Sequence, residues 1–198
     1  LFVSPDCSHE VITDVICDAD ESILLSMYEF TSVSLAEALA DAERRGVAVT
    51  ILMEGGPVGG ISDDEKGVLN FLSRNGAEIF TIESEGNLPA RYRYLHTKYL
   101  VADGEVTVVL SENFKDSGIP ASGYGNRGWG AAVEDSGVAE YFADVFADDL
   151  AGYDIYRWAE GSEPLPETPQ AEKAVTIFKP ATVGNVQVTP VISPDTSF

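Results

Sequence analysis

The sequence has few cysteines, few histidines and no long apolar run, and each shortage excludes a class of function. Its only cysteines, Cys7 and Cys17, would lie about 15 Å apart on one predicted helix, too far for a disulfide. With only two histidines in the chain, a zinc site is not expected. No apolar run approaches the roughly 18–20 residues of a membrane helix, and no positively charged leader precedes the first strand. The compartment stays open: the chain begins at Leu1 without methionine, so a secreted or cell-surface origin is not excluded.

Positive charge is also scarce. The chain has 33 acidic against 12 basic residues, a formal net charge of −21. Such a surface repels polyanions, which disfavours strong non-specific binding of nucleic acid at low salt. The acidic excess fits either a protein kept in solution in a salt-rich cell or a cationic partner. Because the acidic residues are spread along the whole chain, the first account, a halophilic archaeal source, is favoured.

What the sequence does contain is an alternation of strand-like and helix-like segments. Its 198 residues, 44% of them hydrophobic, suffice for one α/β domain with a short appendage. The predicted strands are Leu1–Val3, Ile23–Met27, Val47–Met53, Ala77–Ile82, His96–Ala102, Glu105–Ser111 and Trp129–Val133. The predicted helices are Ser8–Asp18, one capped by Ser34 with Glu37 and ending at Gly46, one capped by Ser62 with Glu65 and ending at Gly76, and one over Val138–Phe146. Since Asp103-Gly104 predicts a hairpin between two of the strands, the sheet should be mixed and flanked by helices.

The composition changes near Glu160 and divides the chain. Residues 1–159 read as the domain, and residues 160–189 as a linker rich in proline and glutamate with edge strands at Val175–Phe178 and Val186–Val191. Residues 190–198 read as the start of a second, truncated repeat, because Ser193-Pro194-Asp195 repeats Ser4-Pro5-Asp6. The alternative is that two strand ends share the same turn chemistry.

One pair of residues suggests phosphoryl chemistry. His96 and Lys98 are two apart on a predicted strand, so their side chains leave the same face. A near-neutral imidazole attacks phosphorus or delivers a proton, and an ammonium neutralises a phosphate oxygen. Ser111 and Asn113 have the same spacing on the partner strand and should reach the same end of the hairpin. The alternative is an ordinary hairpin with polar residues on its open face.

These residues carry a resemblance to a known family. His96-Thr97-Lys98, four residues and then Asp103, followed by Ser111-Glu112-Asn113, resembles the HxKxxxxD–GSxN signature of the phospholipase D superfamily. The similarity extends to the opening strand and its Ser-Pro-Asp turn, and to the helix that ends in Arg45-Gly46-Val47 before a strand. It therefore covers nearly the whole predicted domain and implies a phospholipase D-like α/β fold.

The resemblance implies a metal-independent, two-step exchange at a phosphodiester, with no cofactor and a phosphohistidine intermediate. His96 would be the nucleophile or the general acid, and Lys98 and Asn113 would bind the phosphate oxygens. Ser111 would support the site by hydrogen bonding, and Asp103 would be structural. The substrate would be a phosphodiester in either a phospholipid or a nucleic acid.

Three departures from the family pattern matter. Leu110 stands where the pattern has glycine before the serine. Many relatives carry Asn-x-Glu on the next strand to orient the histidine, but this stretch reads Asn126-Arg127-Gly128, and Glu134 is too far along to substitute. Only one motif is present, so the chain supplies half a site. The other half would come from a missing repeat or from a homodimer mate.

Two further features have two interpretations each. Arg91 and Arg93 precede His96 in a chain where positive charge is scarce, which favours substrate contact over a merely solvated edge. The glycine-rich stretch 55–60 lacks a Gly-Lys-Ser/Thr ending, so it predicts a mobile loop near the site and not a phosphate loop. For the whole chain, the alternative to an enzyme is a degenerate, non-catalytic half that serves binding or assembly.

Overall fold

Apolar strands alternating with amphipathic helices build the first half of the chain, and a computed structural model describes residues 1–86, 88–121, 124–167, 178–184 and 186–193. Within these residues, one sheet has the strand order β1-β7-β6-β5-β2-β3-β4-β8. Its strands are β1 (Phe2–Ser4), β2 (Ser22–Met27), β3 (Ala48–Glu54), β4 (Glu78–Ile82), β5 (Lys98–Ala102), β6 (Val106–Leu110), β7 (Gly128–Glu134) and β8 (Ile155–Arg157). The helices are α1 (Ser8–Asp18), α2 (Val33–Arg45), α3 (Asp63–Arg74) and α4 (Ser136–Leu150).

The sheet is mixed, as the hairpin predicted. Strands β2, β3 and β4 are parallel because α2 and α3 form the crossovers between them, and the remaining neighbours are antiparallel. Asp103 and Gly104 turn the chain between β5 and β6 with φ values of 53° and 65°. The α/β class is therefore confirmed.

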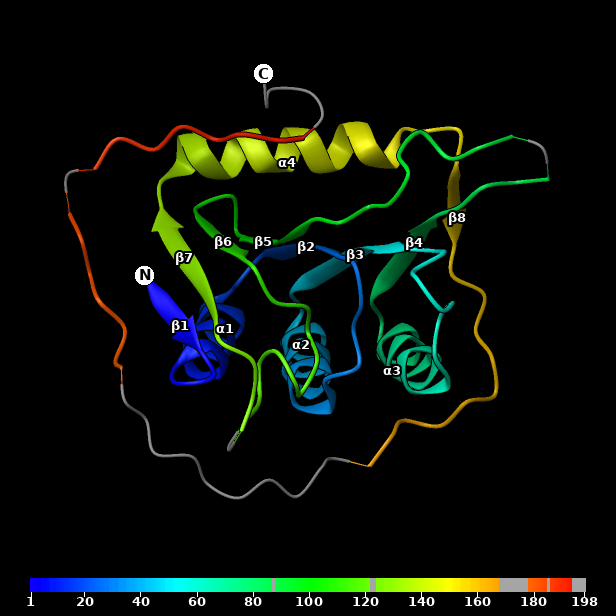
Figure 1. Ribbon diagram of the computed structural model, residues 1–198, viewed down its shortest axis with the longest axis horizontal. Helices are drawn as coiled ribbons and strands as arrows, with labels where there is room; N and C mark the ends of the chain where they lie inside the picture. The colour runs from blue at the N-terminus through cyan, green and yellow to red at the C-terminus, as the bar shows by residue number, and fades with distance from the viewer. Residues whose placement is uncertain (87, 122–123, 168–177, 185, 194–198) are drawn as a thin grey trace.

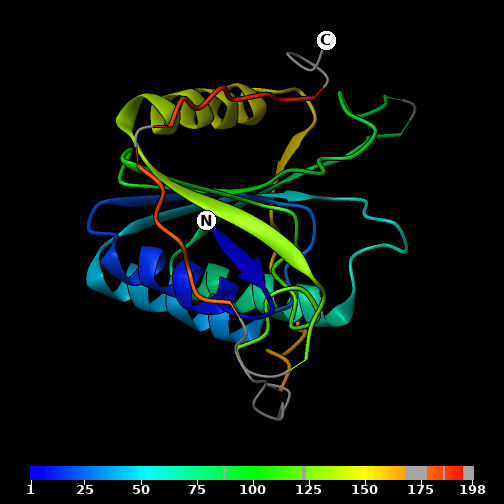
Figure 2. The same cartoon turned by 60° about the vertical axis from the view of Figure 1, so that its left-hand side comes forward.

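Helices cover both faces of the sheet. Figure 1 shows α1, α2 and α3 on one face and α4 on the other, and Figure 2 shows the same layers from the side. Residues of β5 alternate between two buried clusters: Leu100 and Ala102 pack toward α1–α3, whereas Tyr99 and Val101 pack toward α4. Lys98 falls in the first set, so its side chain leaves the sheet on the α1–α3 side.

Asp103 anchors the turn of this hairpin. Its carboxylate accepts the backbone N–H groups of Asp20, Glu21 and Ser22 at 2.8–2.9 Å. Burial alone would raise the pKa of Asp103, but these three hydrogen bonds outweigh it and lower the pKa. The residue holds the hairpin against the start of β2, at the opposite end of β5 from His96.

The helix ends show one correct and one wrong prediction. The Ser62 side chain caps α3 by accepting the N–H of Glu65 at 3.2 Å, as predicted. The capping box at Ser34 was wrong: α2 begins at Val33 with Ser32 at the N-cap position. The Ser34 hydroxyl is hydrogen-bonded instead to the ring of His9 at 2.8 Å. His9 is therefore partly buried between α1 and α2, and burial lowers its pKa.

The C-terminal third departs most from the prediction. The edge strand β8 was not predicted, and Val186–Val191 forms no strand within the described residues. The start of the predicted linker contacts the domain. Gly161 N and Trp158 Nε1 donate to the side-chain oxygen of Asn70 in α3 at 2.9 and 3.0 Å. Of the other predicted edge strand, residues 175–177 lie outside the described part, as do Pro194 and Asp195 of the predicted repeat.

The last described segment runs along α4 in both views. Ile192 packs against the cluster between the sheet and α4. Whether residues 190–198 begin a second repeat stays a prediction. Among the described helices, none has the length and apolar character to cross a membrane.

Candidate functional site

His96 and Lys98 lie where β5 begins, beside the carboxyl end of β2. Lys98 pairs with Met27 in the antiparallel register, so the predicted strand starts two residues later than expected, and His96 stands just before it. The His96 side chain is exposed, whereas Lys98 is 8% exposed. The imidazole is thus accessible directly above a nearly buried ammonium group.

Tyr28 holds these two side chains on one side of the backbone, as their spacing predicted. Its ring centroid lies 4.7 Å from that of His96 and 5.5 Å from Lys98 Nζ. The Tyr28 hydroxyl accepts the N–H of Val58 at 2.8 Å. This bond fixes the glycine-rich stretch 55–60 next to the site, where it was expected.

Glu54, the last residue of β3, positions the segment that precedes His96. Its carboxylate is 6% exposed and accepts Leu95 N at 2.5 Å and Gly56 N at 2.7 Å. Because both hydrogen bonds go to backbone, Glu54 fixes the path of the chain on the two sides of the site. It acts on His96 through the neighbouring residue and not by contact.

Asn113 reaches the same corner of the sheet through Glu29, the second residue after β2. Asn113 Nδ2 donates to Glu29 Oε2 at 2.9 Å, and Lys115 Nζ lies 3.0 Å from Glu29 Oε1. The side-chain oxygen of Asn113 is buried and has no hydrogen-bond partner among the described residues. Through these contacts Glu29 holds the Asn113 amide and the Lys115 ammonium group near Lys98.

Ser111 joins the ends of two strands. Its hydroxyl accepts Trp129 N at 3.0 Å and its backbone N–H donates to Trp129 O at 3.0 Å. These two bonds hold the end of β6 against β7. Leu110, in place of the motif glycine, is 6% exposed and packs into the α1–α3 cluster. The larger side chain points into the core and does not cover the site.

Burial and neighbouring charge set the protonation of the two key groups. Burial and the Lys98 ammonium lower the pKa of His96, against an opposing effect of Glu29. Burial lowers the pKa of Lys98, while the carboxylates of Glu112 and Glu29 raise it. A neutral imidazole beside an ammonium suits nucleophilic attack on a phosphodiester, since the ring is unprotonated and the cation attracts the phosphate.

The two arginines before His96 have different surroundings. The Arg91 guanidinium pairs with Asp154, itself 1% exposed, at 2.8 Å and also binds the carbonyl oxygens of Asp148 and Asp149 at the end of α4. Arg93 is exposed, 5.9 Å from the Tyr94 ring centroid. Arg91 thus fastens the loop to α4, and Arg93 is the one whose guanidinium faces solvent.

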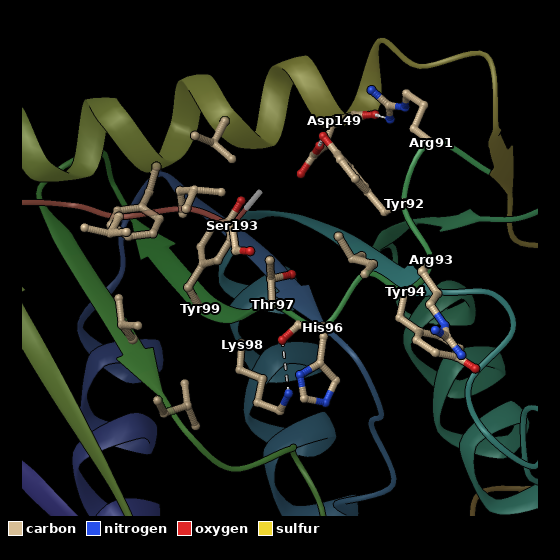
Figure 3. A pocket seen from close by; sticks show the side chains of 17 residues that line it. Arg91, Tyr92, Arg93, Tyr94, His96, Thr97, Lys98, Tyr99, Asp149 and Ser193 are labelled. Atoms are coloured by element: carbon tan, nitrogen blue, oxygen red, sulfur yellow. Dashed lines mark hydrogen bonds between the residues drawn. The ribbon is translucent and has the colours of Figure 1, made fainter. Parts of the chain in front are cut away.

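Both arginines line a cavity of about 720 Å³ between this loop and α4. Figure 3 shows Tyr92 extending toward Asp149 of α4, whereas the His96 and Lys98 side chains point away from that helix. His96 and Lys98 nevertheless line the same cavity, so it extends from α4 to the reactive residues. Within the described residues, no group of three or more histidine, cysteine, aspartate or glutamate side chains could hold a metal ion.

Sequence reasoning missed Tyr28, Glu29 and Glu54. All three stand at the carboxyl ends of the parallel strands β2 and β3 or directly after them. Polar residues at such positions meet at one edge of a sheet, which is a signal that the sequence does contain.

The fold is a mixed α/β domain with one copy of the motif, and His96, Lys98 and Asn113 lie at one corner of its sheet. A family profile described as "Cardiolipin synthase, PLD-like domain" matches residues 12–150. The chain belongs to this phospholipase D-like domain family. A search of curated proteins found no match.

Solved structures show the same fold. Nuc of Salmonella typhimurium, a phospholipase D family member, is 22% identical with a TM-score of 0.65, over 79% of this chain and 94% of that one. NucT of Helicobacter pylori is 15% identical with a TM-score of 0.66, over 79% and 96%. Phosphatidylserine synthase of Haemophilus influenzae is 11% identical with a TM-score of 0.57, over 78% of this chain but 37% of that one.

Proposed function

We propose that the chain supplies one half-site of a metal-independent phosphodiesterase, which hydrolyses or transfers a phosphodiester through a phosphohistidine at His96. The observation that carries this proposal is the exposed imidazole of His96 above the nearly buried ammonium of Lys98, both against Tyr28. A neutral ring nitrogen attacks phosphorus, and the bond to the leaving oxygen breaks. Water or an alcohol then displaces the histidine.

The other residues have supporting parts. Lys98 and Asn113 would neutralise and bind the non-bridging oxygens. Ser111 would keep the end of β6 on β7 through its bonds to Trp129. Arg93 would contact the substrate, since its guanidinium is exposed. Arg91 would contribute to substrate binding by holding the loop that carries Arg93.

The second half-site must come from another copy of the motif, because the leaving oxygen needs a proton from a second histidine. His9 cannot supply it, since its ring is hydrogen-bonded to Ser34 between two helices. The donor would be a homodimer mate or a further repeat. The single-motif length of Nuc and NucT, each almost fully spanned by this chain, favours the homodimer mate.

The substrate would be a phosphodiester of a phospholipid or of a nucleic acid. The catalytic test compares wild type with His96→Ala on bis(p-nitrophenyl) phosphate, plasmid DNA and phosphatidylglycerol vesicles, with His9→Asn as the matched histidine control. We expect His96→Ala to reduce turnover by at least about 10³-fold, because a nucleophile is removed. Retained turnover in His96→Ala, or failure of a radiolabelled diester to label His96 covalently, would overturn the proposal.

A second candidate is a non-catalytic half that binds a phosphodiester or serves assembly. Gly128 favours it, because it stands where many relatives carry the orienting acid. In that case the wild type would bind the diester with the same affinity as His96→Ala and convert none of it.

A further inference from the structure

Glu112 fills a space that two glycines leave open beside the site. It is the second residue after β6, and its side chain lies against Gly128 at the start of β7. A Cβ added at Gly128 would stand 2.6 Å from Glu112 Oε1 and 2.8 Å from its Cδ. A Cβ at Gly118 would stand 3.1 Å from both Glu112 Cβ and Oε2. A side chain at position 128 and the observed position of Glu112 therefore exclude each other.

The carboxylate of Glu112 is approached from two sides. Ser111 Oγ lies 3.4 Å from Oε1, and Asn126 Nδ2 lies 3.4 Å from Oε2. Both distances are long for hydrogen bonds, so these contacts are weak, and the carboxylate oxygens can still accept a hydrogen bond from another donor. Within the part of the chain that the structure describes, Glu112 forms no salt bridge.

Lys98 is the cation that needs such a carboxylate. Its ammonium group is nearly buried, and its hydrogen bond runs to the carbonyl oxygen of His96 at 3.2 Å. A buried ammonium group loses its proton unless negative charge compensates the lost hydration. Glu29 and Glu112 are the two carboxylates that act on it, and Glu29 already pairs with Lys115 and Asn113.

We propose, on the basis of the function proposed above, that Glu112 is a positioning residue of the His96–Lys98 site. From the space above Gly128, its carboxylate holds Lys98 as an ammonium directed at the phosphate. A carboxylate thus stands beside the site at the end of the preceding strand, and it acts on the lysine, whereas the acid of the family pattern acts on the histidine. Glycine at 128 is then a requirement of the arrangement and not a loss of function.

The first test is Glu112→Gln, which keeps the shape and removes the charge. Of the charged groups near Lys98, it leaves Glu29, Lys115 and His96 unchanged. We expect a lower pKa of Lys98, followed by NMR of ¹³C-labelled lysine, where the chain has only five lysines to assign. The alkaline limb of the kcat/KM profile on bis(p-nitrophenyl) phosphate should move to lower pH. A shift of one pH unit corresponds to about a tenfold loss on that limb. Glu112→Asp should restore part of the shift.

Gly128→Ala tests the same idea without touching the acid. The backbone of Gly128 is not left-handed, so alanine is compatible with it, and the new Cβ must displace the end of Glu112. We expect the same downward shift for Lys98, and no further shift when Gly128→Ala is added to Glu112→Gln. Glu134→Gln, at the far end of β7, is the matched control and should leave Lys98 unchanged. Far-ultraviolet circular dichroism checks that each variant is folded.

The outcomes separate this inference from the proposed function. If His96→Ala abolishes turnover but Glu112→Gln keeps both the wild-type pH profile and the wild-type titration of Lys98, the role of Glu112 is refuted and the proposed function stands. If His96→Ala retains turnover, the proposed function fails. The catalytic part of the inference fails with it, and a lysine titration unchanged in Glu112→Gln would also refute the electrostatic contact.

Discussion

Glu65 should make the free energy of unfolding depend on pH. The residue lies in the first turn of α3, is 2% exposed, and accepts the N–H of Phe30 at 2.9 Å. Burial raises its pKa from 4.5 to about 7. The carboxylate of Glu29 adds to the rise, and the hydrogen bonds from Phe30 and Ser62 and the charge of Lys115 oppose it. Glu65 is thus a buried acid that the folded protein prefers to keep protonated.

The sign and size of the effect follow from this shift. A carboxyl group with a folded-state pKa above its unfolded value stabilises the fold less and less as pH rises between the two values. From pH 4.5 to 7 each unit lowers the free energy of unfolding by about 1.4 kcal/mol, about 3 kcal/mol in all. Glu65→Gln removes the titration, and its side-chain oxygen can still accept from Phe30.

The assay is urea unfolding of the wild type, Glu65→Gln and the exposed control Glu10→Gln at pH values from 4.5 to 8. We expect the pH-dependent loss of stability to be about 3 kcal/mol smaller in Glu65→Gln than in the wild type, and unchanged in Glu10→Gln. The comparison is needed because the many other carboxyl groups also ionise over this range. Parallel stability curves for wild type and Glu65→Gln would show that burial does not raise the pKa of Glu65.

Two other predictions concern the site and the surface. Glu54→Ala leaves Leu95 N and Gly56 N without their acceptor. It should therefore reduce the free energy of unfolding by about 3 kcal/mol and lower turnover. If the variant unfolds at the same urea concentration as the wild type, these two hydrogen bonds do not stabilise the fold. The net charge of −21 should make the protein more stable in molar KCl than at 0.1 M, because screening shortens from about 10 Å to about 3 Å. The same urea titration in both salts measures the difference, and stability independent of KCl would argue against the adaptation to salt that the acidic surface suggests.

The sequence predicted the elements whose cause is local. Apolar runs such as Ile23–Met27 identify buried strands by their own composition, and Asp103-Gly104 specifies a hairpin by its turn chemistry. Once the hairpin is known, the spacing of His96 and Lys98 places them on one side. Strand β8 was not predicted because it has only three residues, two half-buried and one exposed, and so short a segment shows no periodicity.

What could not be predicted depends on contacts between distant segments. The sequence favoured substrate contact for Arg91 and did not show its ion pair, because its partner Asp154 is 63 residues away. The capping box at Ser34 was predicted from local sequence alone, but the Ser34 hydroxyl is hydrogen-bonded to His9 and does not cap the helix. Glu112 and Gly128 meet only through the register of β6 and β7, so the sequence alone does not show that the Glu112 side chain occupies the space at Gly128.

The central place of β5 has a consequence for how the site can adapt. This strand is hydrogen-bonded on both edges, to β2 and to β6, so its amide hydrogens should exchange with solvent only when the sheet opens as a whole. Lys98 belongs to that strand, whereas His96 and the Ser111–Asn113 segment lie just beyond strand ends. If the proposed second half-site docks here, Lys98 should keep its position, and His96 and Asn113 should be the residues that adjust to the partner.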